Sequence, residues 1–152
     1  MHSVTHFFVG SSLLLLIGSS LPVAITFAFL FAVLIDLDIL VGWSLGKPRH
    51  HGRTWVQEPF GLLLVGAPLG IVMERFLTQG FLLVTIPYAS HIAIDYLSKH
   101  EVTPLAPFGR ENCNTGVFRR LGAPAREGVS EWYVLTPAII LSVMLVAVRL
   151  MK

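Results

Sequence analysis

The sequence is poor in charged residues and in cysteine. Only 13% of its 152 residues are charged, whereas a soluble domain carries about 25%. The single Cys113 excludes an internal disulfide, and without a CxxC pattern it gives no thiolate zinc site. The formal net charge of +2 is small, and no stripe of Lys and Arg is interleaved with aromatic residues. Nucleic acid is therefore not favoured as a ligand.

Hydrophobic residues make up 54% of the chain and gather in five apolar runs, at residues 4–21, 23–41, 60–77, 81–97 and 132–150. A membrane-spanning helix needs about 20 apolar residues. We therefore expect an all-α polytopic membrane bundle of about five helices in a single domain, residues 1–152, with four helices as the alternative. Pro68 and several glycines predict a third helix that is kinked or re-entrant. The first run lacks a basic region before it and is expected to be retained.

The basic residues predict an orientation. Five crossings place the N-terminus and the polar loops 42–59 and 98–131 on one side, which we expect to be the active-site face. Eight of the eleven basic residues lie there: Lys47, Arg49, Arg53, Lys99, Arg110, Arg119, Arg120 and Arg126. Because Lys and Arg accumulate in cytoplasmic loops, this side is predicted to be cytoplasmic.

Histidines and aspartates are expected to meet at the same face. They stand at the start of the first run, at the end of the second, just beyond it, and at the end of the fourth: His6, Asp36, Asp38, His50, His51, His91 and Asp95. An ionisable group within a membrane span costs about 2.5–3.5 kcal/mol on insertion scales, so it needs a partner or a role. Residues four apart share a helix face, so His91 and Asp95 can bind one ion. The pattern predicts a metal site.

Simpler interpretations stay open for each group. His6 could be a terminal interfacial histidine, Asp36 and Asp38 a solvated helix end, and His91 with Asp95 a hydrogen-bonded packing pair. Two aspartates two residues apart cannot face one point from a regular helix, so the helix end unwinds or one of them acts as a second-shell partner or general base. We expect the remaining polar residues of this face to lie on the surface, namely Glu58, His100 and Glu101. The arginines after the fourth run could contact lipid headgroups or bind a phosphate.

These residues resemble the YdjM-like inner-membrane proteins, a family described as membrane-bound metal-dependent hydrolases. The resemblance covers roughly residues 5–108. It is carried by four short pieces in order: Thr5-His6; Asp36-Leu37-Asp38; His50-His51-Gly52-Arg53-Thr54; and Ser90-His91 to Asp95-Tyr96-Leu97-Ser98 with Thr103-Pro104-Leu105-Ala106-Pro107. The family is in turn similar to zinc-dependent phospholipase C and related single-strand nucleases, which implies phosphoester hydrolysis.

The resemblance implies one to three divalent ions, zinc foremost and manganese or iron as alternatives. The ligands it implies are His6, Asp36 or Asp38 or both, His50, and His91 with Asp95. An aspartate left free, Asp36 or Asp38, would act as general base, and Arg53 or an arginine of the loop after the fourth run would stabilise phosphate charge. One departure stands out: the family loop reads His-Arg-Gly-x-Thr-His, and this chain has His51 at the arginine position and Trp55 at the second histidine. Either a ligand is missing or His51 replaces it.

The expected function is a hydrolase acting on a lipid or lipid-linked phosphoester at the cytoplasmic membrane face, with membrane lipids as its surroundings. A non-catalytic metal-binding or ion-transporting membrane protein is the first alternative. It predicts polar residues through the bilayer, and Thr26, Thr85 and Ser90 are too few to trace a path. The second alternative is a structural protein whose histidines and aspartates only pack helices.

Overall fold

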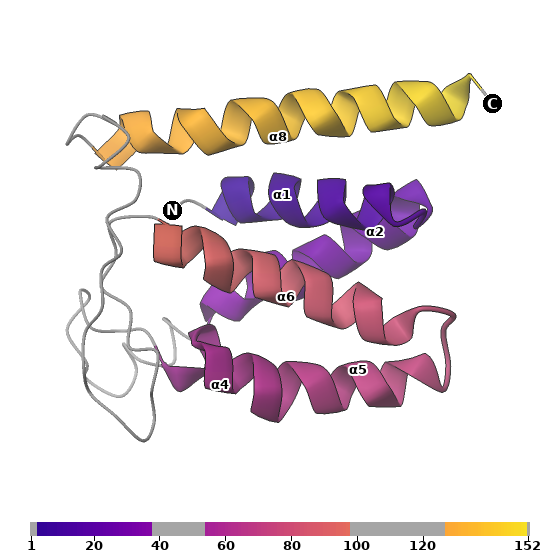
Figure 1. Ribbon diagram of the computed structural model, residues 1–152, viewed down its shortest axis with the longest axis vertical. Coiled ribbons are helices and arrows are strands. Elements are labelled where there is room, and N and C mark those ends of the chain that lie inside the picture. The colour runs from indigo at the N-terminus through magenta and orange to yellow at the C-terminus, as the bar shows by residue number, and fades with distance from the viewer. Residues whose placement is uncertain (1–2, 38–53, 98–126, 152) are drawn as a thin grey trace.

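The computed structural model describes residues 3–37, 54–97 and 127–151, and every regular element in these ranges is helical (Figure 1). The first helix is α1, Ser3–Leu16. The second begins as α2, Leu21–Ala28, and continues through a π-helical turn η1, Phe29–Val33, into a 3-10 turn η2, Leu34–Leu37. The prediction of an all-helical chain is confirmed for these residues.

The third helical segment is preceded by the 3-10 turn η4, Trp55–Gln57. It then runs through α4, Pro59–Gly61, a π-helical turn η5, Leu62–Gly66, and α5, Ala67–Glu74. The long helices α6, Gly80–Leu97, and α8, Glu127–Leu150, complete the bundle. Five helical segments therefore follow one another in the predicted order.

Two boundaries differ from those expected from the apolar runs. The first helix ends at Leu16, because Gly18 adopts φ +95 and Pro22 stands in the first turn of α2. The last helix begins at Glu127, inside the predicted loop 98–131. Apolar periodicity could not mark that start, because Val129 is the one apolar side chain among the first five residues of α8.

The third segment, predicted to be kinked or re-entrant, contains a π-helical turn, η5, which ends two residues before Pro68. Proline has no N–H for the helical ladder, and its ring clashes with the carbonyl four residues earlier. A wider turn relieves that clash. Glycines then let this segment approach α6 closely, since a Cβ on Gly66 would lie 2.7 Å from Tyr88 Cδ1 and one on Gly70 would lie 3.0 Å from Phe81 Cδ2.

Helix α1 packs against α2, α6 and α8 and forms the centre of the bundle (Figure 1). Small residues set the spacing there: a Cβ on Gly10 would lie 3.2 Å from the Cβ atoms of both Ala32 and Pro87. Leu14 and Val84 are fully buried in the core. Glycine and alanine at helix contacts allow the backbones to approach, as is common among membrane helices.

The outer surface of the bundle is apolar. Leu63, Ile71 and Val143 are each about 60% exposed or more, and many other large hydrophobic side chains face outward. Such a surface is unusual for a soluble monomer. By length and composition, one helix of the described part, Gly80–Leu97, could cross a membrane. Four further apolar helical stretches of the described part are shorter, and the one in α8 is Val134–Val148.

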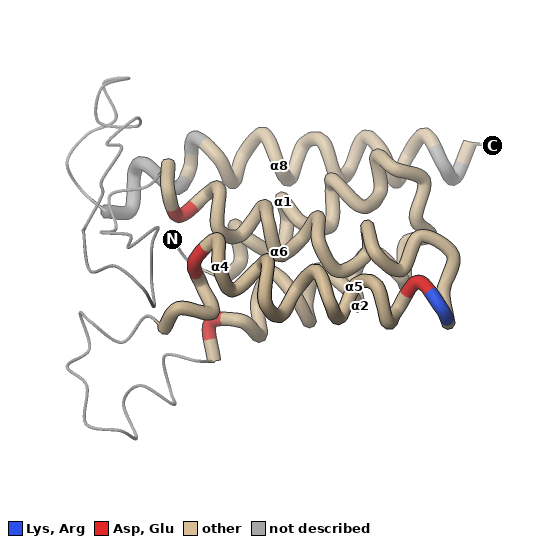
Figure 2. The backbone as a smooth tube through the Cα atoms, turned by 60° about the horizontal axis from the view of Figure 1, so that its bottom comes forward, with Lys and Arg blue, Asp and Glu red and all other residues tan. Residues whose placement is uncertain are grey.

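Within residues 3–37 and 54–97, the charged residues lie at the two ends of the bundle. Figure 2 shows acidic residues gathered at the end where α1 begins, and an acidic and a basic residue together at the opposite end. The second pair is Glu74 and Arg75, which end α5. The first end is the one that carries the candidate site.

We predict that Gly61→Ala destabilises the fold. A Cβ at this position would overlap the backbone carbonyl of Val56, which cannot move without opening the turn between η4 and α4. Overpacking of this kind costs about 1–3 kcal/mol. The matched control is Gly10→Ala, whose new Cβ meets only other Cβ atoms at 3.2 Å or more. Thermal unfolding in detergent should show a larger loss for Gly61→Ala; equal losses would contradict the prediction.

Candidate metal centre

Four of the residues predicted for the site lie together at one end of the bundle. His6 comes from the first turns of α1, Asp36 from η2, and His91 and Asp95 from the last two turns of α6. Three separate helical segments thus each contribute at least one side chain. The prediction that these groups share one face is confirmed for these four residues.

The distances between their donor atoms are short. His6 Nε2 lies 3.2 Å from Asp95 Oδ1. His91 Nε2 lies 3.5 Å from Asp95 Oδ2 and 3.5 Å from Asp36 Oδ1. The two imidazole rings are stacked, with centroids 4.0 Å apart and planes 25° apart. One donor atom each from His6, His91 and Asp95 falls within 4.8 Å of the others, so the three residues could hold a metal ion.

The orientation of His91 is fixed by a backbone contact. Its Nδ1 lies 2.9 Å from the carbonyl oxygen of Ala32, and because a carbonyl only accepts, Nδ1 must carry a proton and donate it. In the neutral ring the lone pair then belongs to Nε2, which faces the two carboxylates. Histidine ligands of metals are commonly oriented by such a second hydrogen bond.

The local irregularity of the second helical segment brings the Ala32 carbonyl to this position. The segment changes there from a π-helical turn to a 3-10 turn, η1 to η2. This change of pitch alters the usual i to i+4 pattern where Ala32 meets His91 and Asp36 turns toward the same ring. Single π-helical turns within helices are often found at functional sites. Of the two alternatives given for Asp36 and Asp38, an irregular helix end is seen at Asp36, and Asp38 lies outside the described residues.

Burial makes this arrangement costly without a cation. The side chains of His6, His91 and Asp95 are 1%, 0% and 6% exposed. Within residues 3–37 and 54–97 the only Lys or Arg is Arg75, which lies at the opposite end of the bundle (Figure 2). Buried carboxylates require a compensating charge.

The donor set fits a bound divalent ion. His6 Nδ1 and His91 Nε2 are buried and make no hydrogen bond within the described residues. A lone pair on His91 Nε2 would be repelled by carboxylate oxygens at 3.5 Å unless a proton or a metal ion lay between them. Imidazole nitrogens with carboxylate oxygens suit borderline divalent metals.

Asp36 differs from the other three groups because its side chain is 21% exposed. Its second oxygen, Oδ2, accepts a hydrogen bond of 2.9 Å from the hydroxyl of Ser3. Asp36 therefore lies between the buried side chains of His6, His91 and Asp95 and the protein surface. Nothing in the sequence singled out Ser3, a small polar residue near the N-terminus.

Other predicted site residues lie outside the described part of the chain, namely Asp38, His50, His51 and Arg53. The expectation that Glu58 is a surface residue is wrong. Glu58 is 1% exposed, and its Oε2 accepts a hydrogen bond of 2.9 Å from the hydroxyl of Tyr96. The topology predicts that loop 42–59, which contains Glu58, lies on the site face. The burial of Glu58 depends in addition on how η4 and α4 fold around it.

A family model described as YdjM inner membrane protein matches residues 1–152. No curated protein and no solved structure matches the chain.

We predict that purified protein in detergent carries near-stoichiometric divalent metal and that the double variant His91→Ala, Asp95→Ala loses it. The variant removes two of the three converging donors. Elemental analysis of both proteins measures the difference. Ser142→Ala, which breaks the Ser12–Ser142 contact between α1 and α8, is the control and should keep its metal. A native protein that stays metal-free after reloading with zinc, manganese or iron would favour the packing interpretation.

Proposed function

Because the chain belongs to the YdjM inner membrane protein family, we propose that it is a membrane-bound metal-dependent hydrolase that cleaves a phosphoester of a lipid or lipid-linked substrate at the cytoplasmic membrane face. The observation that carries the proposal is the convergence of His6, His91 and Asp95 with the partly exposed Asp36. A purely structural metal site would not need an opening to the surface.

We propose that all five helical segments cross or deeply enter the bilayer. The apolar exterior supports this, because large hydrophobic side chains face outward on every segment. Helix α6 has 18 residues and would be about 27 Å long, close to a hydrocarbon core of about 30 Å. Shorter helices are accommodated by local thinning of the bilayer.

The proposed ion is zinc, with manganese or iron as alternatives, because two imidazoles and carboxylates suit all three. When bound, such an ion would supply Lewis-acid chemistry toward a phosphoryl oxygen and would lower the pKa of a water at the site toward about 7. His6, His91 and Asp95 would hold it. The hydrogen bond from His91 Nδ1 to Ala32 keeps the ring aimed at the ion.

Asp36 is the proposed general base. It is the most exposed carboxylate of the group, and the hydroxyl of Ser3 donates to Oδ2, which orients the side chain. Asp38 is the alternative base, with His50 and His51 as further ligands. We assign Arg53 to the phosphate, because a guanidinium binds two phosphate oxygens at once.

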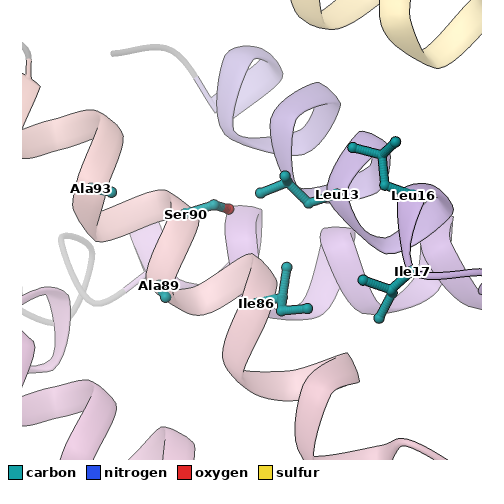
Figure 3. A pocket seen from close by; sticks show the side chains of 7 residues that line it. All are labelled: Leu13, Leu16, Ile17, Ile86, Ala89, Ser90 and Ala93. Carbon is teal, nitrogen blue, oxygen red and sulfur yellow. The ribbon is translucent and has the colours of Figure 1, made fainter.

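A groove between α1 and α6 supports a lipid substrate (Figure 3). Its volume is about 520 Å³, and its lining is apolar except for one hydroxyl: Leu13, Leu16, Ile17, Ile86, Ala89, Ser90 and Ala93. These are the two helices that carry His6, His91 and Asp95, and Leu13 is about 10 Å along α1 from His6. An acyl chain lying in the groove would leave its headgroup toward the site end.

Ion transport is the weaker alternative. A conducting path would need polar groups from the site to the opposite end of the bundle. Between them lies a core of buried apolar residues that includes Leu14, Leu83 and Val84. The described helices therefore favour a site at one membrane face over a path through the membrane.

We predict metal-dependent hydrolysis of a long-chain phospholipid in mixed micelles, lost on chelation and restored by metal. Asp36→Asn should lower turnover about 100-fold or more without loss of bound metal, because it removes the proposed base but leaves the three buried donors. Phosphate or headgroup release measures the rate. Turnover unchanged by chelation would exclude the proposed chemistry.

The same assay distinguishes the role of the groove in lipid binding from the role of the metal centre in hydrolysis. Ala89→Phe fills the groove and should slow hydrolysis of the long-chain lipid several-fold, while a short water-soluble phosphodiester is hydrolysed at the parental rate. Leu63→Phe, at an exposed apolar position on the third segment, is the matched control. Equal effects of both variants on both substrates would contradict the role of the groove.

The native Cys113 tests the orientation, since it is the only cysteine and stands between α6 and α8. In intact spheroplasts we expect a membrane-impermeant maleimide to label it only after permeabilisation. Thr78→Cys in a Cys113→Ser background places the thiol in the turn between α5 and α6, at the other end of the bundle, and should be labelled without permeabilisation. The reverse pattern would place the site outside the cytoplasm.

A further inference from the structure

We infer that Gln57 and Glu58 are positioning residues of the candidate metal centre, which hold Asp36 at its distance from His91. This inference rests on the proposed site, because it concerns the support of Asp36, the proposed base beside the three metal-binding residues. Neither residue belongs to the donor group itself: the ligand atoms within 4.8 Å of one another in the described residues come from His6, His91 and Asp95.

Asp36 needs support that His6, His91 and Asp95 do not. His6, His91 and Asp95 stand within α-helices, whose backbone hydrogen bonds fix them. Asp36 stands in the four-residue 3-10 turn η2, directly after a π-helical turn. Short 3-10 turns have poorer hydrogen-bond geometry than α-helices. The position of Asp36 therefore depends on contacts from outside its own helix.

Gln57 supplies one such contact. It is 1% exposed, and its Nε2 donates to the carbonyl oxygen of Ile35 at 3.4 Å, one residue before Asp36. A buried amide donor aimed at that carbonyl limits the rotation of the peptide that leads into Asp36. The turn η4 also packs against η2.

Glu58 and the turn before it tie this segment to α6. The hydroxyl of Tyr96 donates to Glu58 Oε2 at 2.9 Å, and the hydroxyl of Tyr88 donates to the carbonyl of Val56 at 2.5 Å. His91 and Asp95 lie between these two tyrosines on the same helix. One segment therefore connects the helix that carries two donors to the turn that carries Asp36, and it fixes their separation.

Cobalt(II) tests the inference, because its visible spectrum reports the geometry of its ligands independently of turnover. Asp36 Oδ1 lies 3.5 Å from His91 Nε2, so a displaced carboxylate changes the surroundings of that ligand. We therefore expect Gln57→Leu and Glu58→Ala to weaken Co²⁺ binding about tenfold, the lower end of effects measured for outer-shell partners of metal ligands, and to shift the visible bands. Glu58→Gln keeps an oxygen that accepts from Tyr96 and should restore the parental spectrum. Tyr96→Phe, which removes one oxygen, should match Glu58→Ala and is the mildest change if the other variants fold poorly.

Thr85→Val is the control. It removes a hydroxyl that donates to Phe81 O at 2.7 Å on the same helix, away from the segment, and should leave the spectrum unchanged. The inference would be overturned if Gln57→Leu, Glu58→Ala and Tyr96→Phe all kept the parental affinity and spectrum, even with lower thermal stability. The segment would then only contribute to packing, and the metal centre itself would still stand. A parental protein that binds no Co²⁺ would overturn the metal centre as well.

Discussion

Two stacked imidazoles and two carboxylates share one end of the helical bundle, and much of the surrounding structure follows from the cost of burying them. His91 is fully buried and Asp95 nearly so. Neither can be solvated by water, so each requires fixed partners or a bound cation. The hydrogen bond from His91 to the Ala32 carbonyl, the π-helical turn at that carbonyl and the hydroxyl of Ser3 on Asp36 all serve the same four side chains.

Close helix packing is the condition for this convergence. His6 and His91 stack at 4.0 Å, so α1 and α6 must approach each other closely at this end. Gly10 permits it, because a Cβ there would already press on Pro87 of α6 and Ala32 of η1. In a lipid environment, where burial of apolar surface gives little drive for association, such small residues and a few interhelical hydrogen bonds, such as that between Ser12 and Ser142, hold helices together.

Much of the site was predictable because topology alone sends alternate helix ends to the same side. His6 at the start of one helix and His91 with Asp95 at the end of another must share a face if the helices alternate in direction. The burial of Glu58 could not be predicted in this way, because it depends on tertiary contacts and not on topology. A glutamate before Pro59 in a polar loop has the pattern of a solvated residue, and only the fold of η4 and α4 against α6 brings it beneath Tyr96.

The sequence by itself determined the helical class, the order of the segments, the irregularity at Pro68 and the gathering of histidines and aspartates at one end, because periodicity, proline chemistry and chain direction are local properties. The tertiary structure alone decided which atoms meet. The tautomer of His91 depends on a carbonyl 59 residues away in the sequence. The exposure of Asp36, the burial of Glu58 and the groove between α1 and α6 likewise depend on contacts between segments, which no local pattern records.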